Sequence, residues 1–479
     1  MTERHRSLRE SILYNDLVAV LGVENVSRDE VECQAYVGDV SFLGMVMPRH
    51  NMEVDKPDFI VWPTSTEQVS EVLKVANTHK VPVTPYCGGA GVQGAAVPMF
   101  GGIVMDVKKM DKILEIDETN LKVTCQTGLI GQTLEWALNA KGYTYAHIPQ
   151  STYCSGIGGF LAGHSAGVLS TKYGKIASMV LGMEVVLPNG RVMRTRAVPQ
   201  SAAGPNLNHL FIGSEGTLGV ITEVTMIIHP LPELREFRSF LYPSMHSAFE
   251  AARKIMRRGL LPGTLRISDE EESKELYKQE GSFMTISYDG FEELVKLQHR
   301  ETMKIALEEN AVDIGSAPGD RWWNHRFSSV YPKDIGNPLD MGRHTLNVGN
   351  VIESAGSFTY LQEAHRELSQ ALLRIPGQTF MAHFSHWYKT GGMMYPYCVN
   401  SGAASEEEMI DRYFRMHRTA VGVIHRLGGT MTHHHGVGLS LRGFMREEFG
   451  ESFEMLQSIK HTLDPNNIMN PGKLGFDWR

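Results

Sequence analysis

PYCGGAGVQG, residues 85–94, is the stretch that decides the fold. It directly follows Val81-Pro82-Val83-Thr84, which predicts a short buried strand. Glycines at this density allow positive φ angles and a close approach of a ligand, so that successive backbone N–H groups can bind a pyrophosphate. The pattern is neither a GxGxxG that opens a helix nor a GxxxxGK(S/T), so it predicts neither a Rossmann site nor a P-loop. Taken alone, it is equally typical of a mobile surface loop.

Two further glycine-dense stretches favour ligand binding. SGIGGFLAGHSAG covers residues 155–167 and leads into Tyr173-Gly174 and a predicted strand at 180–187. FIGSEGTLGVIT covers residues 211–222 and adds another tight turn before a predicted strand. Three such loops suit one long ligand, such as a dinucleotide, better than three unrelated turns.

The composition is that of a globular protein. Apolar residues make up 42% and charged residues 21% of the 479 residues, close to ordinary averages, and the length predicts two or three packed units. The net charge of -8 argues against a nucleic-acid partner, which requires a basic face. No apolar run is long enough to span a membrane, and the polar start lacks a signal core. The five cysteines are widely spaced without a CxxC pair, so we expect no disulfide framework, no metal site and a cytoplasmic, reducing compartment.

Residues 57–85 predict a strand–helix–strand unit. Thr64 or Ser65 is the expected N-cap of this helix, which ends near His79. The start of the chain predicts a separate amphipathic helix. Its apolar face is expected to contain Leu8, Ile12, Leu13, Leu17 and Val18.

From Pro230 onward the pattern changes to longer amphipathic helices separated by strands. We therefore place a domain boundary near residue 232. Further helices are predicted at 130–141, 246–258, 292–310, 361–373 and 406–427. Further strands are predicted at 102–106, 122–126, 180–187, 192–195, 220–228, 285–288 and 379–387. The last residues predict a helix end followed by an ordered turn.

MTHHHGVG, residues 431–438, is the sharpest local feature. Three consecutive histidines cannot all face one way, which is poor geometry for a zinc site built within one segment. On a strand or turn, His433 and His435 share a face and His434 lies opposite. A generic triplet would contain one core histidine and two solvated ones. The following Gly-Val-Gly instead favours a loop held against a ligand, where neutral imidazole can donate, accept or act as a base near pH 7.

Three features together resemble the vanillyl-alcohol oxidase / p-cresol methylhydroxylase (PCMH-type) family of FAD enzymes. They are the order of the glycine loops, the stretch GSEGTLGVIT before the change of pattern, and DPNNIMNPGKL at residues 464–474. The resemblance implies an α+β fold. In it, residues 1–232 and 430–479 form a two-part FAD-binding domain, and residues 233–429 form a central α+β cap that covers the isoalloxazine and shapes the substrate pocket. It also implies a homodimer.

The resemblance places FAD against the three glycine loops. The predicted FAD-binding residues are Pro85, Cys87, Gly88, Gly89, Ala90, Gly91, Gln93, Gly94, Gln150, Ser151, Ser155, Gly158, Gly159, Gly163, His164, Ser165, Gly167, Tyr173, Glu215, Gly216, Gly219, Val220 and Ile221. In family members with covalent flavin, a histidine or cysteine carries the bond. Ala90 stands where such a histidine is often found, and the spacing of Cys154 to the second loop is shorter than in the cysteinyl-flavin members. We therefore expect non-covalent FAD and a structural thiol at Cys154.

HHHGVG is similar to the motif of one subgroup, the alkylglycerone-phosphate synthases, whose reaction is redox-neutral. LRISD at 265–269 and MYPY at 394–397 resemble segments that carry an arginine and a catalytic tyrosine there. The resemblance thus places catalytic roles on Arg266 and Tyr395 beside His433, His434 and His435. Without it, Arg266 would be interpreted as a surface ion pair with Asp269 or Glu270, and Tyr395 as a core residue.

The chain also departs from its relatives. Leu339 and Val351 stand where the synthases anchor a substrate phosphate, which weakens the case for such a substrate, although Arg343 could compensate. Residues 385–395 lack the GHxGDGNxH pattern of the D-2-hydroxyacid dehydrogenases. The cap is instead rich in aromatic and thioether side chains, which favours an apolar or aromatic substrate if several of them line the pocket. They are Trp322, Trp323, Phe327, Tyr331, Phe384, Trp387, Tyr388, Met393, Met394, Tyr395 and Tyr397.

We therefore expect an FAD-dependent oxidoreductase that moves a hydride from an apolar or aromatic alcohol or phenol-type substrate to flavin N5. The base is Tyr395 or one of His433–His435, and Arg266 orients the substrate or stabilises charge on the flavin. The alternatives are a redox-neutral, ether-forming synthase and the flavin subunit of a 2-hydroxyacid dehydrogenase with an iron–sulfur partner. The electron acceptor is expected to be O2 or a redox partner protein.

Overall fold

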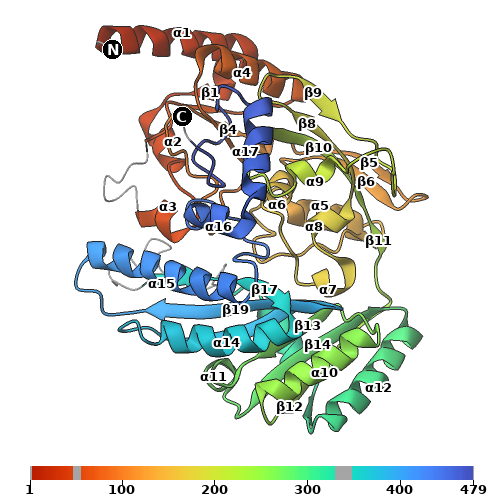
Figure 1. The fold of residues 1–479 in the computed structure, drawn as a ribbon. Coiled ribbons are helices and arrows are strands. Elements are labelled where there is room, and N and C mark those ends of the chain that lie inside the picture. Colours follow the sequence, from red (N-terminus) through yellow and green to blue (C-terminus); the bar gives the residue numbers. More distant parts are fainter. Residues whose placement is uncertain (1–2, 47–54, 329–347, 478–479) are drawn as a thin grey trace.

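The computed structural model describes residues 3–46, 55–328 and 348–477. It is an α+β protein with two halves (Figure 1). One half contains a four-stranded and a five-stranded sheet, and the other contains a single large sheet. The large sheet, with the helices that pack on it, is called the cap below.

The four-stranded sheet has the order β1-β2-β4-β3. Its strands are β1 (Val26–Ser27), β2 (Phe59–Val61), β3 (Val83–Tyr86) and β4 (Ile103–Asp106). Helix α4 (Thr66–His79) connects β2 and β3, and Ser65 caps it by accepting the N–H of Gln68 at 3.3 Å. Strands β2 and β3 both pair with β4 in parallel. The predicted strand–helix–strand unit is therefore confirmed, and the first glycine loop leaves the carboxyl end of β3, where ligands bind in such sheets.

Helix α1 (Glu3–Leu21) packs against α4. Leu13 and Leu17 are buried, as predicted, and so is Leu21 one turn further on. The prediction for Ile12 is wrong, because its side chain is 46% exposed. Positions 13, 17 and 21 follow one another every four residues along a narrow stripe, and Ile12 lies beside that stripe.

The five-stranded sheet is antiparallel and has the order β5-β6-β10-β8-β9. Its strands are β5 (Ile113–Asp117), β6 (Lys122–Gln126), β8 (Val180–Val186), β9 (Val192–Arg194) and β10 (Val220–Ile227), and the short pair β7 (Tyr143–Thr144) and β11 (His229–Pro230) lies apart from it. The predicted hairpin of β8 and β9 is confirmed, with Gly190 at φ +81 in its turn.

The cap sheet begins at β12 (Leu234–Tyr242) and has the order β15-β12-β14-β13-β18-β19-β16, with β17 paired to β19. Its other strands are β13 (Thr264–Ser268), β14 (Ser282–Gly290), β15 (Val312–Gly315), β16 (Val348–Val351), β17 (Ser354–Ser357), β18 (Met381–Tyr388) and β19 (Gly391–Asn400). The predicted long helices are α10 (Met245–Arg257), α12 (Glu292–Glu308), α14 (Phe358–Leu372) and α15 (Glu406–Arg426). Their apolar faces and the sheet enclose one continuous core.

Short helices connect these elements. They are α2 (Glu30–Ala35), α3 (Phe42–Val46), α5 (Gly131–Asn139), α6 (Ile157–Ala162), α7 (Ser170–Tyr173), α8 (Ile176–Met179), α9 (Asn208–Phe211), α11 (Glu270–Glu272), α13 (Ala317–His325) and α16 (Met445–Phe449).

After the cap, the chain returns to the first half through α17 (Ser452–Leu463) (Figure 1). The N–H of Val83 donates to the carbonyl of Ile468 at 2.7 Å, and the N–H of Asn470 donates back to Val83 at 2.8 Å. The tail therefore extends the edge at β3 and is ordered, as predicted. The three-part division at residues 232 and 429 stays a prediction, which these contacts support.

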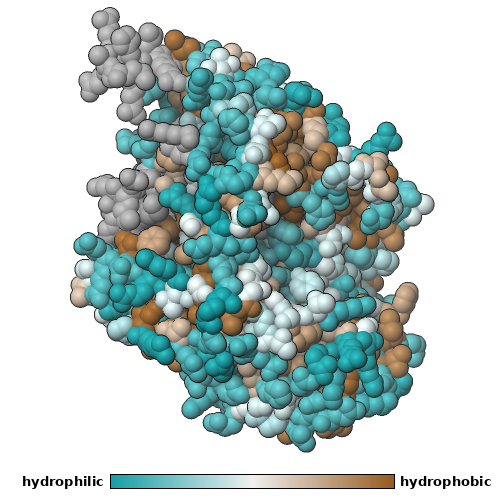
Figure 2. Space-filling model, in the orientation of Figure 1, coloured by the Kyte–Doolittle hydropathy of each residue, from teal (hydrophilic) through white to brown (hydrophobic). Residues whose placement is uncertain are grey.

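Hydrophilic and hydrophobic residues are interspersed over the face seen in Figure 2. Within the described parts of the chain, none of the helices combines the length and the apolar character that crossing a membrane requires.

The C-terminal turn depends on a buried ion pair between Lys460 and Asp464. The Asp464 carboxylate also accepts the N–H groups of Ile468 and Met469. Removing one partner of a buried pair typically costs about 3–5 kcal/mol. We expect Lys460→Met to lower the free energy of unfolding in urea by this amount.

The half-exposed pair of Lys74 and Glu71 provides the control. Lys74→Met should cost less than about 1 kcal/mol. Equal losses in the two variants would contradict the anchoring role of the buried pair.

Candidate functional site

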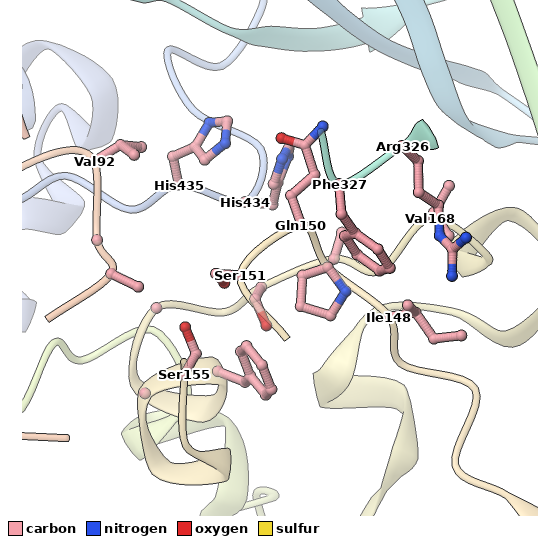
Figure 3. A pocket seen from close by; sticks show the side chains of 18 of the residues that line it. Val92, Ile148, Gln150, Ser151, Ser155, Val168, Arg326, Phe327, His434 and His435 are labelled. Atoms are coloured by element: carbon pink, nitrogen blue, oxygen red, sulfur yellow. The ribbon is translucent and has the colours of Figure 1, made fainter. Parts of the chain in front are cut away.

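A cavity of about 1680 Å³ lies between the two halves. The three glycine loops line one side, and the cap strands, α13 and the histidine loop line the other. Figure 3 shows His434 and His435 across the cavity from Ser151 and Ser155. Sites for one small ligand usually measure roughly 300–1,000 Å³. The cavity therefore has room for a dinucleotide together with a small organic molecule.

The first two glycine loops are pressed against one another. A Cβ on Gly88 would lie 2.1 Å from the carbonyl oxygen of Cys154, and one on Gly156 would lie 2.2 Å from Cys87 Sγ. Only glycine fits at these two contacts. Gly159 differs, because it lines the cavity and a Cβ there would meet open space. The loops thus form a closely packed wall with bare backbone toward the cavity, as a bound pyrophosphate requires.

Most predicted FAD-binding residues line this cavity. They are Pro85, Cys87, Gly88, Gly89, Ala90, Gly91, Gln150, Ser151, Ser155, Gly158, Gly159, Gly163, Ser165, Glu215, Gly216, Gly219, Val220 and Ile221. Five others lie outside its wall, namely Gln93, Gly94, His164, Gly167 and Tyr173. Their contacts are structural: the Gln93 carbonyl accepts the N–H of Leu439 at 2.7 Å, and the Tyr173 hydroxyl donates to Asp289 at 3.2 Å.

Glu215 connects the third glycine loop to the histidine loop. Its carboxylate accepts the N–H of Val437 at 2.6 Å and that of Gly438 at 3.0 Å. Burial raises the pKa of Glu215 to about 7. The nearby Lys473 amine has its pKa lowered to about 7, also by burial.

The histidine loop is built around the buried carboxylate of Glu353. One carboxylate oxygen, Oε1, accepts the N–H groups of His433, His434 and His435, each at 2.8 Å. The Thr432 hydroxyl donates to the same oxygen at 2.7 Å. Consecutive N–H groups that converge on one atom curl the backbone, so the segment is a tight turn and not a strand.

This curl overturns the expected alternation of the three side chains. The Nδ1 atoms of His434 and His435 lie 2.8 and 3.2 Å from Glu353 Oε2, and both residues line the cavity side by side (Figure 3). His433 instead turns away from the cavity, and its Nε2 lies 2.7 Å from the Tyr388 hydroxyl. The prediction that His433 and His435 share a face is therefore wrong.

The protonation states of this group follow from burial. Burial lowers the pKa of His434 to about 4, so its imidazole is neutral at pH 7. Burial alone would raise the pKa of Glu353, but His434 and His435 beside it hold that pKa well below its usual range. A carboxylate anion next to both Nδ1 atoms favours a proton there and leaves Nε2 as the unprotonated ring atom.

Ligand atoms of Glu353, His433 and His434 lie within 4.8 Å of one another, a spacing that metal sites also use. In the described residues, these atoms contact one another: Nδ1 of His434 lies 3.0 Å from Nδ1 of His433 and 2.8 Å from Glu353 Oε2. The expectation of no metal here stays a prediction.

Tyr395 lines the cavity between two imidazoles. Its ring stacks on His383 at 5.0 Å and meets His435 edge-on at 5.6 Å. Burial raises the pKa of Tyr395, so its hydroxyl stays protonated at neutral pH. Its position suits a hydrogen-bond donor better than a base.

Arg266 also reaches the cavity, but it is not a free cation. It forms a buried ion pair with Glu272 at 2.8 Å. The alternative of a surface ion pair with Asp269 or Glu270 is therefore wrong. The predicted role of stabilising charge on a ligand is weakened, because the neighbouring carboxylate already neutralises the guanidinium.

Among the residues of the site that sequence reasoning missed are Glu353, His383 and His386. His386 lies where the pairing of β18 with β19 shifts register, and its φ is +52. The irregularity turns the side chain into the cavity beside His433 and His434, with ring centroids 5.2 and 4.9 Å away. Its Nδ1 contacts the Ser170 hydroxyl of the other half. Strained backbone of this kind persists where the surroundings enforce it, typically at functional sites.

The aromatic side chains of the cap divide into two groups. Trp322, Phe327, Met393, Tyr395 and Tyr397 line the cavity. Trp323, Phe384, Trp387, Tyr388 and Met394 do not, and Phe384, Trp387 and Met394 belong to the core. Tyr331, Leu339 and Arg343 lie outside the described residues, while Val351 ends β16.

Family comparisons agree with this arrangement of loops and cap. A family described as "FAD binding domain" matches residues 57–196, and "FAD linked oxidases, C-terminal domain" matches residues 231–474. The chain belongs to the FAD-linked oxidase family. This FAD-linked oxidase has the PCMH-type arrangement of an FAD-binding domain and a cap.

Relatives of known name cover nearly all of this FAD-linked oxidase. An uncharacterized FAD-linked oxidoreductase, YgcU, of Escherichia coli (strain K12) is 31% identical over 98% of this chain and 99% of its own length. The alkyldihydroxyacetonephosphate synthase of Dictyostelium discoideum is 29% identical over 91% of this chain and 76% of its own. A solved alkyldihydroxyacetonephosphate synthase structure superposes with a TM-score of 0.81 at 26% identity, covering 97% of this chain and 86% of that one.

Gly159 gives a direct test of where FAD lies. We expect Gly159→Ala to leave folding intact or to stabilise it by about 0.5–1 kcal/mol, since Gly159 is in helix α6. A methyl group in the space of the cofactor should weaken FAD binding by about 1–3 kcal/mol, or roughly 10- to 100-fold in Kd. Flavin fluorescence titration of the apoprotein and urea unfolding measure the two effects.

The matched control is Gly422→Ala, a helical glycine of α15 whose Cβ would also meet open space. It should not change FAD affinity. Unchanged affinity in Gly159→Ala would show that FAD does not contact this wall.

Proposed function

We propose that this FAD-linked oxidase dehydrogenates a small hydroxylated organic molecule with an apolar or aromatic body. When bound, FAD supplies the acceptor for the hydride that leaves the carbon. The observation that carries the proposal is the pair of histidines, His434 and His435, whose Nδ1 atoms lie beside the Glu353 carboxylate at the cavity wall opposite the glycine loops.

In this proposal, Nε2 of His434 or His435 accepts the hydroxyl proton of the substrate. Neutral imidazole with Nδ1 beside a carboxylate is the arrangement that a general base requires, because the imidazolium formed is stabilised where it arises. Tyr395, with its protonated hydroxyl, donates a hydrogen bond to the substrate oxygen. Glu353 is the positioning residue for both imidazoles.

The substrate class rests on the lining of the cavity. Trp322, Phe327, Met393 and Tyr397 offer aromatic and thioether surface in the cavity that Tyr395 also lines. Such surface favours an aromatic or apolar body with one polar group near the histidines. The electron acceptor in this proposal is O2 or a redox partner protein.

We also propose that FAD is bound without a covalent link. Ala90 offers no nucleophile, and burial raises the pKa of the Cys87 thiol to about 12, which leaves little thiolate. Acid precipitation of the purified protein should therefore release flavin into the supernatant. Flavin retained in the pellet would contradict this and point to Cys154, which also lines the cavity.

Anaerobic mixing with a probe alcohol tests the main proposal. We expect 4-hydroxybenzyl alcohol to bleach the flavin absorbance and the colour to return only when an acceptor is added. His434→Gln should slow the bleaching by about 10²–10⁴-fold, the usual contribution of a general base. His209→Gln, which alters an exposed histidine outside the cavity wall, should bleach at the normal rate.

A second candidate is redox-neutral ether formation, favoured by the histidine triplet and the 29% identity to the synthase. Exchange of a long-chain alcohol into an acyl-dihydroxyacetone phosphate without any acceptor would support it. That outcome, without persistent bleaching by any alcohol or 2-hydroxyacid, would refute the oxidation proposed here.

A further inference from the structure

A continuous row of polar atoms runs from the cavity to the surface through the histidine loop. His434 lines the cavity, and its Nδ1 lies 3.0 Å from Nδ1 of His433. The opposite nitrogen of His433, Nε2, lies 2.7 Å from the hydroxyl of Tyr388. The Tyr388 side chain does not line the cavity and is 38% exposed. Two imidazoles and one phenol thus connect the substrate side of the loop to solvent.

We propose that His434, His433 and Tyr388 form a relay that carries the substrate proton out of the cavity. This inference rests on the proposed function, because oxidation of an alcohol releases its hydroxyl proton to the base at this site. His433 and Tyr388 do not touch the substrate and act through His434. They are therefore positioning residues of the reaction.

The hydrogen-bond polarity of the row allows such a transfer. With His434 protonated at Nδ1, that N–H donates to Nδ1 of His433, and the N–H at Nε2 of His433 then donates to the Tyr388 oxygen. A proton that arrives at Nε2 of His434 releases the Nδ1 proton to His433, which releases its Nε2 proton to Tyr388. Tyr388 passes its own hydroxyl proton to water. One proton enters and one leaves, and all three groups end neutral. Both imidazoles end in the opposite tautomer, so each must exchange its ring proton with water before the next turnover.

The surroundings keep the three groups neutral at rest. Burial lowers the pKa of His433 well below its usual value and raises the pKa of Tyr388 to about 12. Glu353 stabilises the transient imidazolium of His434, with which it is in contact. The other titratable groups around the two imidazoles are Lys175, whose amine contacts the His433 carbonyl, together with His147, His386 and His435.

Tyr388→Phe is the direct test. The variant keeps the ring beside His433 and removes only the hydroxyl. With 4-hydroxybenzyl alcohol as probe and in dilute buffer, we expect kcat to fall at least about 10-fold with KM unchanged, because proton release becomes limiting. High imidazole concentration should restore kcat, and the solvent isotope effect should rise. Tyr14→Phe, a half-buried tyrosine on α1, is the control and should show none of these changes.

Turnover of Tyr388→Phe at the wild-type rate in dilute buffer would overturn the relay. So would a loss of kcat that imidazole does not restore, because a purely structural defect does not respond to a mobile proton acceptor.

A second measurement does not depend on activity. In ¹⁵N-histidine NMR spectra of the holoenzyme, assigned with His433→Gln and His434→Gln, we expect His434 protonated at Nδ1 and His433 at Nε2. The opposite tautomers, or a tightly bound transition metal that occupies these nitrogens, would overturn the relay. If the wild type oxidises no alcohol while the tautomers are as expected, the proposed oxidation fails and takes the relay with it.

Discussion

The buried carboxylate of Glu353 is the contact on which the arrangement of the site depends. A buried anion is tolerated only when its oxygens are hydrogen-bonded, and here one oxygen accepts three consecutive backbone N–H groups and a hydroxyl. These donors fix the path of the backbone, and the path fixes where each imidazole points. Glu353 belongs to the cap, between β16 and β17, while the loop it holds belongs to the C-terminal segment. Lys175 of the first half contacts the same loop through the His433 carbonyl.

The opposite wall depends on a different constraint, the close approach of backbone to backbone. Gly88 and Gly156 lie where any side chain would collide with the neighbouring loop. The glycines therefore have two different roles, and the sequence alone does not show which glycine has which role. Some, such as Gly88, let two loops pack together, and others, such as Gly159, leave the cavity wall bare.

Features with local causes could be predicted from the sequence. The cap at Ser65, the hairpin turn at Gly190 and the glycine loops all depend on residues close in the chain, and each is found in the structure. The longer helices that were predicted by range lie within a few residues of those found, whereas no range was predicted for α17 or for short helices such as α13.

The site itself depends on contacts between distant residues, and there the sequence was a poor guide. Glu353 stands in an unremarkable stretch, and nothing local indicates that its carboxylate meets a loop some eighty positions later. The orientation of the three histidines was wrong because the alternation of an extended strand does not apply to a backbone curled around one oxygen. Arg266 found its partner in Glu272 across a turn, and His386 enters the cavity only through an irregular pairing of two strands.

The bond between Glu215 and the histidine loop gives the two walls of the cavity a common support. Glu215 belongs to the third glycine loop, yet its carboxylate accepts the N–H groups of Val437 and Gly438, just beyond the histidines. We therefore expect a ligand that orders the glycine loop to favour the same arrangement of the histidine loop, and thermodynamic linkage would make the effect reciprocal.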